Sequence, residues 1–303
     1  MPNPMPALSL VAIPGRRAAT LELAGEIEKR GFSGIYMPSM LDALAFCEAL
    51  SFATKQIRFG TSIMPIYLRQ PADYANTTSF IHEVSGGRFH FGIGISHAPS
   101  LKRMGLTWGK PLADMRAFVE TYRAAPRTGD KPPVVIAGLR KKMIALAGEI
   151  GDGLVFANGA LSHMKKSLGA LPADKRSSAD FFIGNMVPTC ISDDVEAAKA
   201  VNRRTLIHYL ELPNYRNYWR EAGYGEEIDA VEKAIDAGEN ASIADMMGER
   251  WIDDVTIFGP LSRVRERVEA WYDAGIRTPI LVPSATAGGQ MKAFEEVIGA
   301  FTK

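Results

Sequence analysis

The residues best suited to chemistry lie close together, in the segment Gly92-Ile93-Gly94-Ile95-Ser96-His97. Its glycines let a ligand approach the backbone, and the serine and histidine that follow can exchange protons. The segment ends an apolar run, so we expect it at the carboxyl end of a strand, where α/β enzymes bind their ligands. We interpret Gly94 and Ser96 as residues that admit a planar ring system, and His97 as an acid or base near pH 7. In the alternative interpretation His97 only caps the next helix.

A second apolar run ends in the same manner, directly before this one in the chain. It begins at Ile57 and contains Gly60-Thr61-Ser62. One helix-length segment, residues 70–85, separates the two runs. The pattern predicts a β-α-β unit whose strand ends lie side by side and leave room for a cofactor or substrate.

A third signal is typical of an anion site. The run that ends at Ala137-Gly138 is followed by Arg140-Lys141-Lys142 at the expected start of a helix. Positive side chains at a helix N-terminus oppose the helix dipole, but together with free N–H groups they favour a bound phosphate. Three solvated side chains on a surface helix are the alternative.

Other chemistries find less support in the sequence. The glycine pattern departs from the dinucleotide fingerprint because His97 stands in place of the third glycine. The remaining histidines show neither HxH nor HExxH spacing, so we expect no metal site. A nucleophile elbow of the form G-x-S-x-G is absent, which argues against a serine hydrolase.

Short apolar runs alternate with helical periodicity along the whole chain. The candidate strands are Ala7–Ile13, Gly34–Pro38, Ile57–Ile63, Arg88–Ile95, Pro133–Ala137, Gly153–Ala157, Phe181–Ile191 and Pro279–Val282. Several are apolar throughout, as expected for parallel strands that are covered on both faces. The alternation predicts an α/β protein with a (β/α)8 TIM barrel, and a doubly wound open sheet is the alternative.

The regular spacing is interrupted between the seventh and eighth candidate strands. Residues 192–278 separate them, and about 192–255 read as a helical insertion rich in Tyr, Trp and His. Extra helices packed on the barrel are one interpretation, and a lid or a dimer surface is the other. No repeat or linker divides the chain, so we expect a single domain over residues 1–303.

Composition and net charge limit the binding partners and the cellular compartment that we expect. A net charge of +1 gives no reason to expect nucleic acid or a membrane surface as a partner. The N-terminus lacks the basic region of a signal peptide, and no segment is long and apolar enough to span a membrane. Cys47 and Cys190 show no sign of pairing, which favours a reduced, cytoplasmic protein.

These segments together resemble the luciferase-like monooxygenase superfamily, whose (β/α)8 enzymes use FMN or the deazaflavin coenzyme F420. The resemblance covers nearly the whole chain. It is carried by GFSGIYMP, TKQIRFGTSI, LRQPADYA, SGGRFHFGIGISH, PPVVIAGLRKKMIALAGEIGDGLVF and FGPLSRVRERVEAWYDAGIRTPIL. The most specific parts are S-G-G-R-F followed by G-x-G, and the helix A-G-E-I-G-D-G.

Within the superfamily the chain looks more like the F420-dependent branch, because of its Gly-Thr-Ser-Ile, its Ser96-His97 pair and its Asp42-Ala-Leu44. The resemblance implies a bulge with a non-prolyl cis peptide at Ser62–Ile63 that supports the central ring. It also implies a phosphate-binding segment at Gly138–Lys142. The cofactor-binding residues expected are Thr61, Ser62, Ile63, Gly94, Ser96, His97, Ala137, Gly138, Leu139, Arg140 and Met143.

One position departs from the family pattern. Many members carry an acidic residue and a histidine at the end of the second strand, where this chain has Ser39 and Met40. A proton donor expected there is missing, which leaves the acid–base role to His97. We therefore take His97 and Ser39 as the candidate catalytic residues.

The function implied is hydride transfer between F420 and a small organic substrate. An FMN-dependent monooxygenase that uses O2 is the first alternative, and a barrel that lost its chemistry at Ser39-Met40 is the second. Analogy with the family implies a homodimer.

Overall fold

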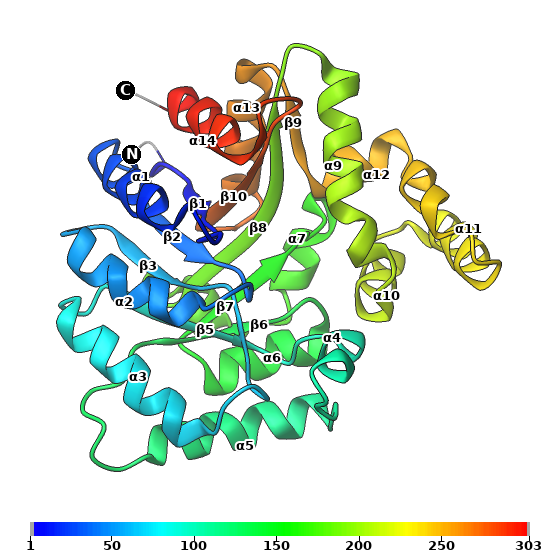
Figure 1. Cartoon of the computed structure of the whole chain (residues 1–303). Coiled ribbons are helices and arrows are strands. Elements are labelled where there is room, and N and C mark those ends of the chain that lie inside the picture. Colours follow the sequence, from blue (N-terminus) through cyan, green and yellow to red (C-terminus); the bar gives the residue numbers. More distant parts are fainter. Residues whose placement is uncertain (1–2, 302–303) are drawn as a thin grey trace.

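The computed structural model describes residues 3–301, which form a closed barrel of parallel strands (Figure 1). Around the barrel the strand order is β10-β1-β2-β3-β5-β6-β7-β8, and β8 pairs with β10 to close the ring. The strands are β1 (Ala7–Ser9), β2 (Gly34–Met37), β3 (Arg58–Thr61), β4 (Met64–Pro65), β5 (Phe89–Gly94), β6 (Val134–Ala137), β7 (Gly153–Ala157), β8 (Phe182–Ile191), β9 (Ile257–Gly259) and β10 (Thr278–Ser284). The predicted (β/α)8 barrel is confirmed, and the open doubly wound sheet is wrong.

Helices surround the barrel and bury the outer faces of its strands (Figure 1). They are α1 (Arg17–Lys29), α2 (Ala43–Ala53), α3 (Pro71–Val84), α4 (Ala98–Arg103), α5 (Pro111–Ala124), α6 (Lys141–Ile150), α7 (Leu161–Leu168), α8 (Ala173–Ser177), α13 (Leu261–Asp273) and α14 (Gly289–Ala300). Every residue of β1 and β2 is buried, as expected for strands covered on both faces. Within the described part of the chain, no helix combines the length and apolarity that a membrane span requires.

Apart from shifts of one or two residues at other strand ends, the strands differ from the sequence prediction in three places. The predicted strand Ile57–Ile63 ends at Thr61, and the short β4 resumes the pairing with β5 after a bulge. The first predicted strand, 7–13, stops at Ser9. The sequence also missed β9, which pairs with the far end of β8 beyond the barrel. Three residues are too few to give a periodic signal, which explains that omission.

Residues of very different size share the barrel interior. The inward cluster contains Ala7, Tyr36, Val135, Val155, Met186 and Ile280. Glycines occupy further inward positions, because Gly34 and Gly184 lie two residues from Tyr36 and Met186 along their strands. Branched residues of β6, β7 and β10 therefore share the interior with the large side chains of Tyr36 and Met186 and with glycines.

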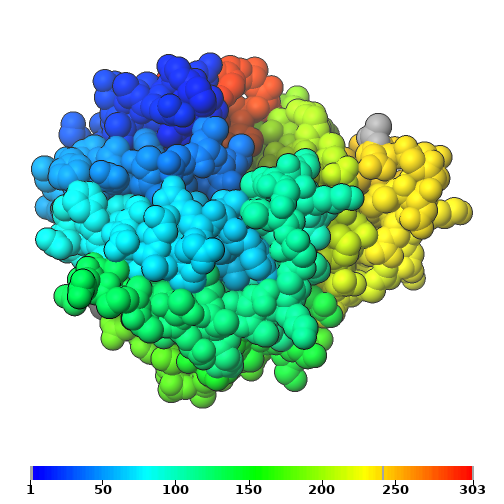
Figure 2. Space-filling model, turned by 60° about the horizontal axis from the view of Figure 1, so that its bottom comes forward, coloured from blue at the N-terminus to red at the C-terminus, as the bar shows by residue number. Residues whose placement is uncertain are grey.

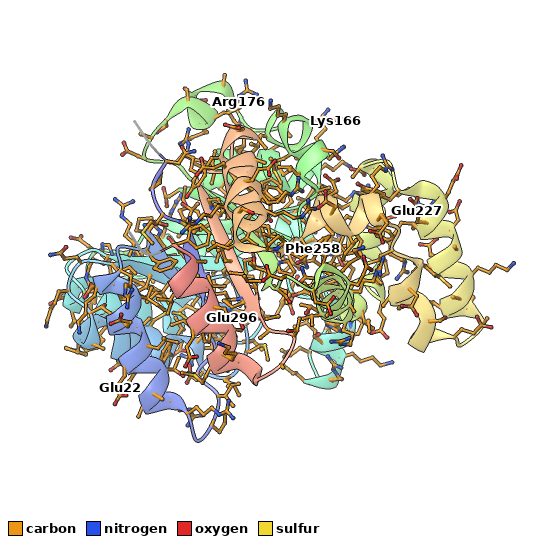
Figure 3. All side chains as sticks on the ribbon, turned by 90° about the horizontal axis from the view of Figure 1, so that it is seen from above. Glu22, Lys166, Arg176, Glu227, Phe258 and Glu296 are labelled. Carbon is orange, nitrogen blue, oxygen red and sulfur yellow. The ribbon has the colours of Figure 1, made fainter. Side chains whose placement is uncertain are left out.

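Helices also fill the long connection between β8 and β9. They are α9 (Val195–Leu210), α10 (Pro213–Glu221), α11 (Gly225–Asp236), the 3-10 helix η1 (Asn240–Met246) and α12 (Glu249–Val255), and they fall within the insertion predicted at about 192–255. They share a core of their own, which includes Trp219, Trp251 and Phe258. In Figure 2 the insertion (yellow) projects from one side of the molecule, and in Figure 3 Glu227 of α11 lies on the opposite side of the molecule from Glu22 of α1.

Candidate functional site

The structure brings most of the predicted site residues to one end of the barrel. The ends of β3, β5 and β6 are neighbours, since β3 and β4 pair with β5, and β5 pairs with β6. Ile63, Gly94 and Ala137 therefore lie next to one another at the carboxyl end of the strands. Ile63 and Ala137 are partly exposed and pack at the edge of the inward cluster. This end of the barrel is where barrel enzymes carry their active sites.

The bulge after β3 has the peptide geometry that the resemblance implied. The Ser62–Ile63 peptide bond is cis, so that expectation is confirmed. Thr61 and Ser62 are both buried. The Thr61 hydroxyl donates to the Gly92 carbonyl at 2.7 Å, and the Ser62 amide donates to the Met37 carbonyl at 2.6 Å. Both residues thus hold the strands together, and Ile63 presents its side chain to the barrel mouth.

Gly94 makes room for Ile63. A Cβ atom at position 94 would lie 2.7 Å from Ile63 Cδ1 and 3.2 Å from Ala137 Cβ. We expected Gly94 to admit a planar ring directly against the strand. The structure instead puts the Ile63 side chain over Gly94, so a ligand at this end of the barrel would lie against Ile63.

His97 follows β5 and is the N-cap residue directly before α4. Ser96 before it has a positive φ of 65°. The His97 side chain makes no capping hydrogen bond, which argues against a simple capping role. Its ring lies 5.8 Å from the ring of Tyr215 in α10, and Nδ1 is buried without a hydrogen-bond partner. An unpaired buried nitrogen is costly in a folded protein, so a hydrogen bond from a ligand that reaches this atom would be favourable.

The environment of His97 keeps its ring uncharged at neutral pH. Burial lowers the pKa of His97 to about 4, and the positive charge of His208 acts in the same direction, while a hydrogen bond with Asn214 opposes them. From the sequence we expected an unperturbed pKa near 7. A buried neutral imidazole instead takes up a proton, or donates its single N–H, without starting from a charged state.

Two buried histidines predict a loss of stability in acid. The pKa of His90 is also lowered to about 4 by burial, and both groups titrate near 6.5 when the chain unfolds. Between these values the unfolded chain binds more protons. The free energy of unfolding should therefore fall from about pH 6.5 to pH 4, by up to about 1.4 kcal/mol per pH unit for each histidine.

Urea unfolding between pH 4.5 and 7.5 tests this prediction. His90→Gln and His97→Gln should each flatten the slope. Equal slopes in all three proteins would refute it.

Helix α6 begins where the sequence predicts, but the side chain of Arg140 directly before it already has a partner. Arg140 directly precedes α6, and Lys141 and Lys142 are exposed in its first turn. Their N–H groups have no partner within the helix. Arg140, however, forms an ion pair with Glu221 of α10 at 2.6 Å. Because both side chains are about half exposed, the pair is worth only about 0–1 kcal/mol, and an anion could displace it.

Helix α10 forms one wall of this region, which the sequence did not reveal. It contacts the residues after three strands: Tyr215 meets His97 after β5, Glu221 meets Arg140 after β6, and Trp219 Nε1 donates to the Asn158 carbonyl after β7 at 3.1 Å. The insertion therefore covers part of the barrel mouth. The only sequence signal was the aromatic content of the insertion, which also fitted a dimer surface.

The remaining predicted site residues differ in how far they are exposed to solvent. Ser39 is exposed in the loop after β2 and makes no hydrogen bond among the described residues. Gly138 is buried, while Leu139 and Met143 are partly buried against the main core. Among residues 3–301, no three His, Cys, Asp or Glu side chains gather in a way that could hold a metal ion.

The family model for luciferase-like monooxygenases matches residues 8–278, so the chain belongs to this family. A Mycobacterium tuberculosis (strain ATCC 25618 / H37Rv) protein that carries the name "putative coenzyme F420-dependent oxidoreductase" is 25% identical, over 88% of this chain and 90% of that protein. A 5,10-methylenetetrahydromethanopterin reductase of Archaeoglobus fulgidus is 27% identical, over 82% and 83% of the two chains.

Solved structures share the same fold. The coenzyme F420 dependent tetrahydromethanopterin reductase of Methanopyrus kandleri superposes with a TM-score of 0.78 at 16% identity, and 98% of each chain is covered. The oxygenating constituent of 3,6-diketocamphane monooxygenase of Pseudomonas putida, in complex with FMN, gives a TM-score of 0.65 at 16% identity, over 100% of this chain and 97% of that chain.

Proposed function

We propose that this protein is an F420-dependent oxidoreductase that transfers a hydride between the deazaflavin ring and a small organic substrate. The observation that carries the proposal is the unpartnered Nδ1 of His97 at the same barrel end as Ile63. An apolar side chain after β3 and an unsatisfied nitrogen after β5 fit a planar, polar ring. The F420-related relatives support this choice of cofactor.

The residues present suit the cofactor in three ways. Ile63 and Ala137 would contact the ring, the free N–H groups of Lys141 and Lys142 would bind the phosphate, and Arg140 would approach the acidic tail. When bound, F420 supplies the hydride. His97 Nδ1 would hold or move a proton beside the ring, and the aromatic side chains of α10 would exclude water from His97.

Fluorescence titrations with F420 and FMN test the cofactor. We expect F420 to bind with a dissociation constant in the micromolar range and FMN at least about tenfold more weakly. The fold shared with FMN enzymes makes an O2-using monooxygenase the second candidate, and tight FMN binding without F420 binding would establish it. A protein that binds neither cofactor would fit a barrel that lost its chemistry.

Replacing Gly94 with alanine should weaken F420 binding about tenfold, because the new Cβ displaces the Ile63 side chain against which the ring would lie. Stability should fall only modestly, since Ile63 Cδ1 and Cγ1, 2.7 and 2.9 Å away, belong to a side chain that can rotate and Ala137 Cβ at 3.2 Å needs only a small shift. The double variant Gly94→Ala/Ile63→Val removes Cδ1 and should recover part of the affinity. An F420 affinity that does not respond to Gly94→Ala, measured by fluorescence, would place the ring elsewhere.

Replacing Arg140 with glutamine should weaken F420 binding about fivefold at low salt, and the difference should shrink at 0.5 M NaCl because exposed charges are screened. Glu221→Gln is the matched variant: it breaks the same ion pair but leaves the guanidinium free, so F420 should bind equally well or more tightly. Equal losses in the two variants would mean that the ion pair itself, rather than the cation, supports the site.

We also propose that residues 1–303 act as one barrel domain with its insertion, as a homodimer in the cytoplasm. Family analogy supports the dimer, and the two buried free cysteines fit a reducing compartment. Sedimentation equilibrium on the purified protein tests the dimer.

A further inference from the structure

A cavity of about 530 Å³ opens at the end of the barrel opposite His97. Its walls come from the first residues of strands and the loops before them, among them Gln56 and Arg58 at β3, Pro133 at β6 and Thr278 at β10. The amino ends of parallel strands meet at one end of a barrel, and the carboxyl ends meet at the other. The cavity is thus separate from the proposed F420 site.

Glycines explain why space remains at this end. Gly34 and Gly153 occupy inward positions of the first layer, two residues from Tyr36 and Val155. A Cβ atom at Gly34 would lie 2.7 Å from the Tyr36 ring, and one at Gly153 would lie 2.6 Å from Phe182 Cβ. Barrel layers are normally filled by branched side chains. Here two aromatic rings and open space take their place.

Three rings line the inner wall of the cavity. The Phe182 ring lies 5.3 Å from the Tyr36 ring and 5.5 Å, edge to face, from the His90 ring. The Tyr36 hydroxyl and His90 Nδ1 are 3.3 Å apart, which is the one hydrogen bond of the His90 ring among the described residues. Because burial lowers the pKa of His90 to about 4, this wall is uncharged at neutral pH. It suits a flat aromatic molecule.

The rim of the cavity carries an exposed guanidinium that has no carboxylate partner. Arg58 forms no ion pair within residues 3–301. Three carboxylates line the cavity. Glu28 accepts the backbone N–H groups of residues 55–57, Asp152 accepts from Val134 N and Arg123, and Asp180 forms no ion pair with Arg58 among the described residues. Arg58 is therefore free to bind a planar carboxylate with two parallel hydrogen bonds.

We propose that this cavity binds a small aromatic carboxylate, with its ring among Tyr36, His90 and Phe182 and its carboxylate on Arg58. The volume lies within the range of small-molecule sites. The aromatic walls would bind the ring of the ligand, and the guanidinium would favour a carboxylate over a neutral group. The inference stands on the cavity alone and does not depend on which cofactor the other end of the barrel binds.

Calorimetric titration with benzoate tests the site, with acetate and benzyl alcohol as comparison probes. Benzoate should bind with a dissociation constant of about 1 mM or tighter, and each comparison probe at least about tenfold more weakly. Its affinity should be the same with and without saturating F420. Loss of benzoate binding when F420 is added would overturn the proposal, because it would place benzoate at the barrel mouth.

Arg58→Gln should weaken benzoate binding about tenfold and leave F420 binding unchanged. Arg204→Gln, which removes an exposed arginine on α9, is the matched control and should have no effect on benzoate. Tyr36→Phe keeps the ring and provides a second folded variant, which should retain binding within about threefold. Benzoate affinity that is equal in wild type and Arg58→Gln, or no binding to wild type up to 10 mM (about ten times the expected constant), would refute the site.

Discussion

Turnover should fall about 100-fold or more when His97 is replaced by alanine, while F420 still binds within about threefold of the wild-type affinity. His97 is the titratable side chain whose unpartnered nitrogen lies at the proposed reaction end of the barrel. Asn214 and Tyr215 of α10 hold its ring in place. A group that moves a proton in the reaction affects the rate constant far more than it affects cofactor affinity.

Steady-state kinetics and fluorescence titration on the same preparation separate these quantities. His208→Ala is the control, since it removes a half-exposed histidine of α9 that only influences the charge of His97. Unchanged turnover of His97→Ala with F420 bound would exclude an acid–base role. A loss of F420 binding equal to the loss of turnover would instead make His97 a binding residue.

Gly92→Ala should destabilise the protein by more than about 3 kcal/mol, and it should accumulate largely unfolded. A Cβ atom at position 92 would lie 1.8 Å from the Thr61 carbonyl oxygen, which is backbone and cannot swing aside. The same two residues share the hydrogen bond from the Thr61 hydroxyl. On its other side β5 pairs with β6, so the strand has no free direction in which to move.

Thermal and urea unfolding measure this effect. Gly25→Ala is the matched control, because Gly25 lies within α1 and a Cβ atom there has nothing within 4 Å. That variant should gain about 0.5–1 kcal/mol from helix propensity. A Gly92→Ala protein as stable as the wild type would show that the barrel wall yields much more easily than its packing indicates.

Periodicity was enough to predict the barrel. The runs at Gly34–Pro38, Pro133–Ala137 and Gly153–Ala157 agree with β2, β6 and β7 to within one residue. Continuous apolar runs between amphipathic helices have few solutions other than a closed parallel sheet, since both strand faces must be buried. Periodicity showed neither the bulge after Thr61, which the family resemblance implied, nor the short β9, which was missed, because neither changes the local hydrophobic pattern.

The site was predicted in part. Residues from the ends of β3, β5 and β6 meet because neighbouring parallel strands end at the same side, and their order in the chain shows which strands are neighbours. The contacts of Asn214, Tyr215 and Glu221 with the site could not be read from the sequence. They lie more than 70 residues from their partners, and only the folded insertion carries α10 to the barrel mouth.

By itself, the sequence determined the elements, their parallel pairing and the end of the barrel where His97, Gly94 and Ala137 meet, since local periodicity and chain order encode all three. Only the tertiary structure decided what surrounds them. It placed Ile63 over Gly94, paired Arg140 with Glu221 and buried His97 against α10, which lowers its pKa to about 4. It also opened the cavity beside Arg58. Burial, charge and empty space arise from contacts between distant segments, so a linear pattern cannot specify them.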